Sequence, residues 1–355
     1  MNIATQSTDL YENDKGSENL PSYMDLIRMM TGMWVSQAIY VTAHLGIADL
    51  LKDSSKSIAQ LAEETETDVS SLYRVIRALA SVGIFKEVEP NEFALTKTGE
   101  YLRSDVPNSL RSISMMLGDK CSWQSWGEII QVVKTGKTPF KSLYQVDNIF
   151  EYFKNNPESS KIFDDAMTNF TKNAIHTALL DTYDFSGFSK VVDVAGGHGA
   201  LIASILKINP QIKGVLFDLP NVVSGAYNLL EKEGVANRCE IFSGDFFKSV
   251  PSGGDVYILS QIVHDWDDDS CTRFLKNIRN AISENGKLVV IDAVIPSSDE
   301  PHFNKWLDLD LLVKFPGGRE RTESEFNHIF KAAGFDITKI MSTASTISVI
   351  EAACI

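Results

Sequence analysis

The sequence predicts an α/β fold, with a Rossmann-like doubly wound sheet that follows a smaller helical domain. From residue 184 onward, short runs of apolar, often β-branched residues alternate with stretches of helical periodicity. This alternation is typical of a mostly parallel sheet that is covered on both faces. The first run, at 191–194, leads into a cluster of glycines at 196–199 and then into a helical pattern. With 355 residues, the chain is longer than one core usually fills, so we expect two domains.

The N-terminal part begins with a polar segment and continues with an unusually apolar helix. Residues 1–20 lack a basic start followed by an apolar core, so we expect a disordered tail and no signal peptide. A helical pattern extends from Pro21 to Leu51, and its apolar residues lie nearly all round the helix. One small domain offers too few partners for such a surface, which indicates a subunit interface.

Two shorter helices and a hairpin follow, and together they predict a winged helix over residues 21–105. The helices are expected at 57–63 and 70–79, and the hairpin joins the runs 84–88 and 92–96. Winged helices often bind DNA. However, acidic residues crowd the first of the two helices and the formal charge of the chain is -14, which disfavours both nucleic acid and anionic membranes as partners. A packing role is therefore favoured.

Residues 106–183 are expected to form a helical linker that also lines a substrate pocket. Methionine and aromatic side chains recur there, and together they suit a flat organic ligand. We name Met115, Phe163 and Met167 as candidates for contact with a substrate. Each of them taken alone is explained as well by a place in the core.

Residues 184–355 are expected to form the sheet domain. After a helix at 322–333, two short runs at 337–341 and 347–353 are expected to end the sheet as an antiparallel hairpin. The preceding strands are expected at 190–195, 214–218, 239–243, 255–260 and 287–292, and the helices between and after them at 199–208, 221–233, 269–283 and 303–314.

Three aspartates follow the ends of the first three predicted strands. Asp193 lies beside the glycines, Asp218 ends the second strand and Asp245 follows the third. Ligands of such a sheet collect at the carboxyl ends of the strands. We therefore expect Asp218 to accept hydrogen bonds from ribose hydroxyls, and Asp245 with Phe246 to bind an adenine ring. Each aspartate alone is also explained as a helix cap.

A nicotinamide cofactor is the first alternative for the glycine cluster. Its fingerprint, G-x-G-x-x-G or a final Ala, places a pyrophosphate on the helix N-terminus. Starting at Gly197 the chain has a bulky Ile202 at the third position of this fingerprint. The pattern favours a nucleoside without a pyrophosphate.

Six motifs occur in order along the second half of the chain. They are Asp193-Val194-Ala195-Gly196-Gly197-His198-Gly199, Phe217-Asp218-Leu219-Pro220, Gly244-Asp245-Phe246-Phe247, His264-Asp265-Trp266-Asp267-Asp268, Asn285-Gly286-Lys287 and Gly317-Gly318-Arg319-Glu320-Arg321-Thr322. With them, the chain from about residue 22 resembles the class I S-adenosylmethionine-dependent O-methyltransferases of the plant caffeate/flavonoid and bacterial secondary-metabolite (hydroxyneurosporene, phenazine and anthracycline) type.

The resemblance implies a cofactor, a product and an assembly. The cofactor is S-adenosyl-L-methionine, the product is S-adenosyl-L-homocysteine, and no metal is used. The sheet has an antiparallel last strand. The N-terminal all-helical winged-helix domain forms a homodimer and contributes to the substrate pocket of the partner.

The resemblance also assigns ten residues to cofactor binding. In two places the chain departs from the plant pattern. Ala195 replaces the first glycine, which is a mild change if the backbone there is not left-handed. Ser260 stands where plant members have a lysine near the adenine, so we expect weaker polar contacts. The ten residues are Asp193, Gly196, Gly197, Asp218, Leu219, Gly244, Asp245, Phe246, Ser260 and Gln261.

Methyl transfer to a hydroxyl requires an oxygen nucleophile, and a phenol with a pKa of about 10 is mostly protonated at neutral pH. A histidine with a pKa of about 6.5 can remove that proton. The resemblance assigns this role to His264, with Asp292 and Glu320 as the acids that orient its ring and Asp265 as an acid close to the acceptor. Plant enzymes commonly have Glu at the position of Asp292, so the shorter arm is expected to need a water or a shifted histidine.

We therefore expect a cytoplasmic, homodimeric O-methyltransferase that methylates a hydroxyl of a small aromatic or polyketide-like secondary metabolite. One alternative keeps the cofactor but is diverted to hydroxylation, decarboxylation or cyclisation; the retained base and its two acids favour methylation. Another is a ligand-sensing regulator, which the acidic charge disfavours. Four cysteines without CxxC spacing indicate reduced thiols. The sequence leaves open the acceptor, the choice between O- and N-methylation, and whether Arg321 pairs with the protein or a substrate.

Overall fold

A computed structural model describes residues 23–170 and 179–355, so the predicted tail at 1–20 lies outside the described residues. The described chain forms two compact units. The first comprises residues 125–152 and 179–355, and the second comprises residues 23–124 and 153–170. The helices between 106 and 183 are thus shared between the units, and the domain boundaries drawn from the sequence stay a prediction.

The second unit contains the predicted winged helix. Its hairpin packs with α3 and α4 around a core that includes Leu61, Ile76, Phe85 and Phe93. The chain enters α3 through a capping box, in which Ser57 and Gln60 satisfy each other's backbone N–H groups. The elements are α1 (Tyr23–His44), α2 (Ile47–Leu50), β1 (Lys56–Ser57), α3 (Ile58–Glu64), α4 (Val69–Ser81), β2 (Phe85–Glu89), β3 (Glu92–Leu95), η2 (Gly99–Leu102), α5 (Arg111–Gly118) and α10 (Pro157–Phe170).

One strand of this unit was not expected. Lys56 and Ser57 pair antiparallel with Phe93 and Glu92, which gives a small sheet in the order β1-β3-β2. The pair is too short to show a period of two in the sequence. The winged helix therefore carries a three-stranded sheet in addition to its helices.

Helix α1 exposes most of its apolar surface. In its 22 residues only Thr42 and Ala43 are buried. Its C-terminal half packs against α5, where a Cβ on Gly118 would overlap the ring of Tyr40. The exposed large apolar side chains are those of Tyr23, Met24, Leu26, Met29, Met30, Met33, Trp34 and Val35.

The first unit is built on a seven-stranded sheet in the order β6-β5-β4-β7-β8-β10-β9. The five strands from β4 to β8 are parallel, and β10 is antiparallel to both of its neighbours. The predicted fold class and the terminal hairpin are confirmed. The strands are β4 (Lys190–Val194), β5 (Lys213–Asp218), β6 (Cys239–Ser243), β7 (Val256–Ser260), β8 (Lys287–Asp292), β9 (Phe335–Ser342) and β10 (Ser348–Cys354).

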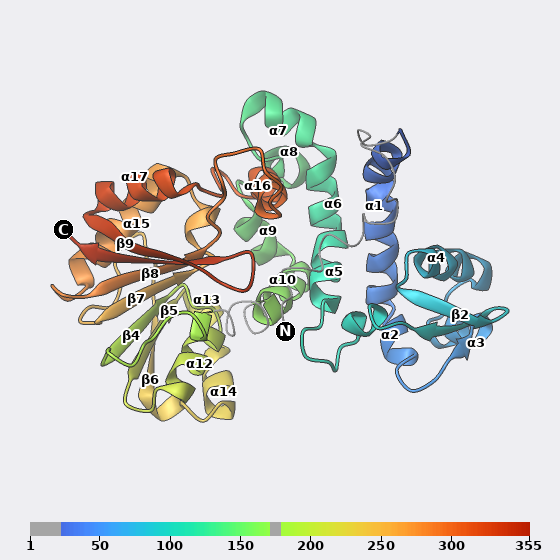
Figure 1. Cartoon of the computed structure of the whole chain (residues 1–355), viewed down its shortest axis with the longest axis horizontal. Coiled ribbons are helices and arrows are strands. Elements are labelled where there is room, and N and C mark those ends of the chain that lie inside the picture. The colour runs from blue at the N-terminus through green and yellow to red at the C-terminus, as the bar shows by residue number, and fades with distance from the viewer. Residues whose placement is uncertain (1–22, 171–178) are drawn as a thin grey trace. The chain divides into compact units, whose positions relative to one another are not determined.

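Helices cover both faces of this sheet, as Figure 1 shows: α12 and α14 lie on one side, and α15 and α17 on the other. The predicted helix at 221–233 is divided into α13 and α14 at Ser224 and Gly225, since glycine is a weak helix former. The helices are α12 (Ala200–Ile208), α13 (Pro220–Val223), α14 (Ala226–Lys232), η4 (Ala236–Arg238), η5 (Val263–Asp265), α15 (Asp268–Ala281), α16 (Asn304–Lys314) and α17 (Glu323–Ala333). Earlier in the chain are α6 (Lys120–Gly127), which spans both units, α7 (Ile129–Thr135), α8 (Phe140–Tyr144) and α9 (Ile149–Asn155), which also spans both.

The main core lies between the sheet and helices α15 and α17. Val192, Tyr257 and Leu288 of the strands pack there against Phe274 and Phe330 of the helices, and all five are fully buried. The chain proceeds from β4 to β5 and β6 on one side, and then to β7 and β8 on the other. The carboxyl ends of β4 and β7 therefore meet at the point where the order of strands reverses, which is where such sheets bind ligands. No helix in the described ranges is long and apolar enough to span a membrane.

Candidate active site

The turn between β4 and α12 is shaped by its glycines. Gly197 and Gly199 have φ angles of 60° and 83°, a region that glycine adopts readily. At Gly196 a Cβ would lie 2.5 Å from Asp193 Oδ2 and 2.6 Å from Leu216 Cδ1, so no larger residue fits. Ala195 has a φ of 57°, which is left-handed. The replacement of the usual glycine by alanine was expected to be mild only without a left-handed backbone, so here it carries strain. At the end of the sheet, this turn therefore presents backbone atoms that no glycine side chain covers.

Asp193 and Asp218 lie beside this turn and differ in their hydrogen bonds. Asp193 is 1% exposed, and its Oδ2 has no hydrogen-bond partner among the described residues. Burial, helped by the charge of Asp218, raises the pKa of Asp193 to about 7. Asp218 accepts the N–H of Gly197 at 2.8 Å and that of Leu219 at 2.6 Å. Burial raises the pKa of Asp218, and these two hydrogen bonds oppose the shift.

Asp245 and Phe246 follow β6. Asp245 Oδ1 accepts the N–H of Phe247 at 2.9 Å, which is a local turn contact of the kind that the sequence left open. Gly244 lies against Phe217, whose ring a Cβ at Gly244 would approach to 2.6 Å. The ring of Phe246 makes an edge contact with Trp266, with centroids 6.1 Å apart. These rings form an aromatic wall at the end of β6.

Trp266 belongs to this aromatic wall, although no role was predicted for it from the sequence. It also contacts Phe247 at 4.7 Å and stacks on Phe150 at 6.3 Å between centroids. Its place in the segment after His264 was the available signal.

Ser260 and Gln261 end β7. Ser260 Oγ is buried and makes no hydrogen bond to any residue in the described part of the chain. The side-chain amide of Gln261 instead donates to Asp292 Oδ1 at 3.0 Å and to the carbonyl of Ile291 at 3.2 Å. Ser260 and Gln261 stay predictions as cofactor residues, and Gln261 has in addition a contact that the sequence did not predict.

Three carboxylates surround His264, which lies in η5 directly after β7. Nδ1 is 3.4 Å from Glu320 Oε1 and 3.6 Å from Asp292 Oδ1, and Nε2 is 3.6 Å from Asp265 Oδ1. All four side chains are largely buried. The structure therefore brings together the predicted base, its two predicted acids and the predicted acceptor-side acid.

Burial and charge act in opposite directions on His264. Desolvation lowers the pKa of His264, but the charge of Asp292, the hydrogen bond to Glu320 and the charge of Asp265 together raise it to about 10. Burial raises the pKa of Asp292 to about 7 and that of Asp265 to about 6, while the charge of His264 lowers both. His264 is therefore a stronger base than a histidine in water.

Arg321 holds the backbone of the turn that carries His264. Its guanidinium donates to the carbonyls of Val263 at 2.8 Å and Trp266 at 2.7 Å, and pairs with Asp268 at 2.7 Å. Arg321 is fully buried. The question that the sequence left open is thus answered, because its partners are groups of the protein.

Two further polar residues of α16 support Glu320. Asn304 Nδ2 donates to Glu320 Oε1 at 3.4 Å, and Asp308 Oδ1 accepts the N–H of Glu320 at 2.7 Å. Sequence reasoning missed both. Their spacing of four residues, which places them on one face of a helix, was the available signal.

The candidates for substrate contact other than Asp265 belong to the second unit. Met115 lies on α5, and Phe163 and Met167 lie on α10, which packs against α5. All three are half-buried, and Phe163 contacts Phe153 with ring centroids 4.9 Å apart. Their role in substrate binding stays a prediction.

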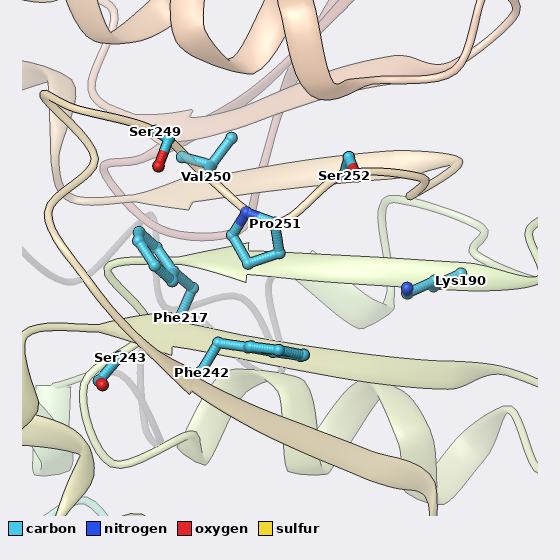
Figure 2. Close-up of a pocket in the computed structure, with 8 residues that line it drawn as sticks. All are labelled: Lys190, Phe217, Phe242, Ser243, Ser249, Val250, Pro251 and Ser252. Carbon is cyan, nitrogen blue, oxygen red and sulfur yellow. The ribbon is translucent and has the colours of Figure 1, made fainter.

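A cavity of about 450 Å³ lies on the sheet of the first unit under the segment 249–252 (Figure 2). The rings of Phe217, Phe242 and Pro251 line it, together with Lys190. None of the four residues of the His264 cluster lines it. Among the described residues, no group of three or more His, Cys, Asp and Glu side chains is arranged to hold a metal ion.

Comparisons with known proteins agree with this geometry. A family model described as O-methyltransferase domain matches residues 126–336, and one described as O-methyltransferase dimerisation domain matches residues 27–105. The chain is 41% identical to the phenazine O-methyltransferase PhzM of Lysobacter antibioticus over 341 residues. The match covers 96% of this chain and 98% of the relative.

Two solved structures are similar over nearly the whole chain. The crystal structure of LaPhzM has a TM-score of 0.90 at 41% identity and covers 95% of this chain and 100% of the other. The O-methyltransferase NcsB1 from neocarzinostatin biosynthesis, in complex with S-adenosylmethionine and 2-hydroxy-5-methyl naphthoic acid, has a TM-score of 0.79 at 27% identity. That match covers 93% of this chain and 98% of the other.

Proposed function

This chain belongs to the O-methyltransferase family and is an O-methyltransferase of the secondary-metabolite kind, and we propose that it methylates a hydroxyl of a small aromatic or polyketide-like molecule with His264 as the general base. The observation that carries the proposal is the position of His264 Nδ1, 3.4 Å and 3.6 Å from two buried carboxylates. The comparisons support methyl transfer and not the diverted chemistry.

The residues at the end of β4 fit S-adenosyl-L-methionine. Asp193 offers a buried acceptor oxygen that no residue in 23–170 or 179–355 satisfies, and the lack of a side chain at Gly196 lets the backbone of the turn pack directly on Asp193 and Leu216. The cofactor supplies a methyl group on a sulfonium and leaves as S-adenosyl-L-homocysteine. We assign its binding to Asp193, Gly196, Gly197, Asp218, Leu219, Gly244, Asp245, Phe246 and Ser260. Gln261, the tenth residue that the resemblance assigns to the cofactor, instead donates its side-chain amide to Asp292. No step is assigned to a metal.

The carboxylates determine which ring nitrogen of His264 acts as the base. Because Nδ1 faces two acceptors, it carries a proton, which leaves the lone pair of Nε2 for the acceptor hydroxyl. Asp265, 3.6 Å from Nε2, lies on the side from which the hydroxyl approaches. A base with a pKa near 10 matches a phenol with a pKa of about 10, so the proton transfer is nearly balanced. Asp292 and Glu320 then stabilise the imidazolium.

We assign the exposed apolar side chains of α1 to the interface of a homodimer, because they lie within the residues that match the dimerisation domain. Met115, Phe163 and Met167 are assigned to the acceptor pocket. The net charge of -14 disfavours nucleic acid and membranes as partners. The thiols of Cys239, Cys271 and Cys354, which form no disulfide, support a cytoplasmic location.

The test is calorimetric titration with S-adenosylmethionine and S-adenosylhomocysteine, followed by a labelled-methyl screen over phenolic, quinone and polyketide acceptors. We expect binding of both nucleosides and transfer that is lost in His264→Ala. Binding without transfer to any acceptor would contradict the assigned reaction, and a lack of binding would contradict the cofactor site.

A further inference from the structure

We propose that Gln261 is a positioning residue of the methyl transfer: its side-chain amide holds Asp292 as the charge partner of His264 and leaves Glu320 as the hydrogen-bonding partner of the ring. The inference rests on the proposed function of His264. It assigns Gln261 to the base and not to the adenine of the cofactor, where the sequence placed it.

Both carboxylate oxygens of Asp292 accept hydrogen bonds from the segment that carries His264. Its Oδ1 accepts the amide of Gln261 at 3.0 Å, and its Oδ2 accepts the N–H of Val263 at 3.2 Å. Both oxygens are thereby fixed, while His264 Nδ1 stays 3.6 Å away, beyond hydrogen-bond distance. Glu320 is nearer to Nδ1 and has a second oxygen without a partner among the described residues. Asp292 acts on the ring through its charge, and Glu320 acts through contact.

Gln261 has an unusual backbone conformation. Its φ of 56° is in the left-handed region, which costs a non-glycine residue about 1 kcal/mol or more. The conformation is held by the N–H of Gln261, which donates to the carbonyl of Ile291 at 2.9 Å. The left-handed turn directs both amide groups of Gln261 to the end of β8, where Asp292 lies. Such strain persists where the surrounding structure over-determines it, and often at functional sites.

The amide of Gln261 stabilises the ionised form of Asp292. Asp292 is fully buried, and burial raises its pKa to about 7, so the carboxylate form needs its hydrogen bonds. Asp265, Glu320 and Arg321 are the other charged groups that act on this cluster. Without Gln261, the proton settles more readily on Asp292. The imidazolium of His264 then loses one of its stabilising charges, and the pKa of His264 falls.

The experiment replaces Gln261 with Met, which has a similar length but no amide. In the full-length protein, we expect the pH midpoint of kcat to fall by about one unit and the limiting rate at alkaline pH to fall severalfold. The affinity for S-adenosylmethionine should stay within about twofold. NMR of ¹³C-labelled histidine, with the His264 signal assigned by its loss in His264→Gln, should show the same fall in pKa without cofactor or acceptor.

Two further variants separate positioning from folding. Gln145→Met changes another glutamine with a left-handed backbone, at the exposed C-terminus of α8, and should behave as the wild type. Gln261→Asn suits the left-handed conformation and keeps the amide, but its shorter side chain does not reach Asp292. It should stay folded, with at most a small fall in the unfolding temperature, and still show the acid shift of the Met variant.

Two results would overturn the inference. The first is an unchanged titration of His264 in Gln261→Met. The second is a tenfold weaker binding of S-adenosylmethionine with that titration unchanged, which would return Gln261 to the cofactor. If the wild type transfers no methyl group, the proposed function fails, and the NMR titration still decides whether Gln261 acts on His264.

Discussion

Two groups of buried carboxylates lie at neighbouring strand ends, and they differ in what neutralises them. At the ends of β4 and β5, Asp193 and Asp218 face backbone N–H groups and each other, and the charge of His198 also acts on Asp218. Asp193 keeps an oxygen without a partner in the described chain. After β7 and β8, three acids surround the imidazole of His264. The first group is therefore held mainly by backbone N–H groups, whereas the second group surrounds a cation of the protein.

The largest effect should come from removing that cation. His264→Ala deletes the base, so methyl transfer should fall by about 10²–10⁴-fold, as measured with labelled S-adenosylmethionine. The affinity for the cofactor should stay within about twofold, because the group at β4 is untouched. A parallel loss of cofactor affinity would show that the two groups are not separate.

The pH dependence of the reaction sharpens the comparison. The carboxylates raise the pKa of His264 from 6.5 to about 10, so at neutral pH the free enzyme holds mostly imidazolium. Deprotonation supplies the base, so kcat/KM should rise with pH by about tenfold per unit above pH 7 and level off near pH 10. Asp292→Asn should move the levelling point toward acid. A profile that levels off near pH 6.5 in the wild type would mean that the acids do not act on the ring.

Asp193→Asn tests the group at β4. We expect the Kd for S-adenosylmethionine to rise about tenfold or more, since a charge-assisted hydrogen bond is lost. Folding raises the pKa of Asp193 from 3.8 to about 7, so ionisation of this carboxyl opposes folding. The free energy of unfolding of the wild type should therefore fall as the pH rises from 3.8 to 7. The ligand-free variant should therefore gain stability over the wild type across that range in thermal unfolding.

Asp218→Asn provides the contrast within the pair. Burial raises the pKa of Asp218 as well, but its two backbone hydrogen bonds oppose the shift. Asp218→Asn should therefore gain clearly less stability than Asp193→Asn in thermal unfolding of the ligand-free protein. Equal effects of the two substitutions on stability would contradict the difference drawn between them.

The smallest effect is expected at Ala195. Its left-handed backbone costs about 1 kcal/mol, which Ala195→Gly relieves, while the added chain entropy offsets part of the gain. The free energy of unfolding should rise by no more than about 1 kcal/mol in denaturant titration. Gly197→Ala, at a similar φ in the same turn, should lower it. A loss of stability in Ala195→Gly would mean that the alanine methyl group packs usefully.

The parallel strands could be predicted from the sequence because each contains a short run of apolar residues and is followed by its own turn signal. The resemblance assigned His264 and Glu320 from their motifs and Asp292 from the end of the fifth predicted strand, and the structure brings the three together. Gln261, Asn304 and Arg321 show the limit of this reasoning. Each is a common residue whose hydrogen-bond partner lies 16 to 58 positions away, so only the folded sheet determines where its side chain donates.

The position of β10 has a consequence for the order in which the molecule is assembled. Ser348 pairs with Asp292, and β10 lies between β8 and β9. During synthesis, β8 therefore remains the edge of the sheet until the last strand has left the ribosome. A nascent chain that carries every motif residue still lacks the strand that pairs with Asp292, so we expect the cluster around His264 to form only after β10 has been synthesised.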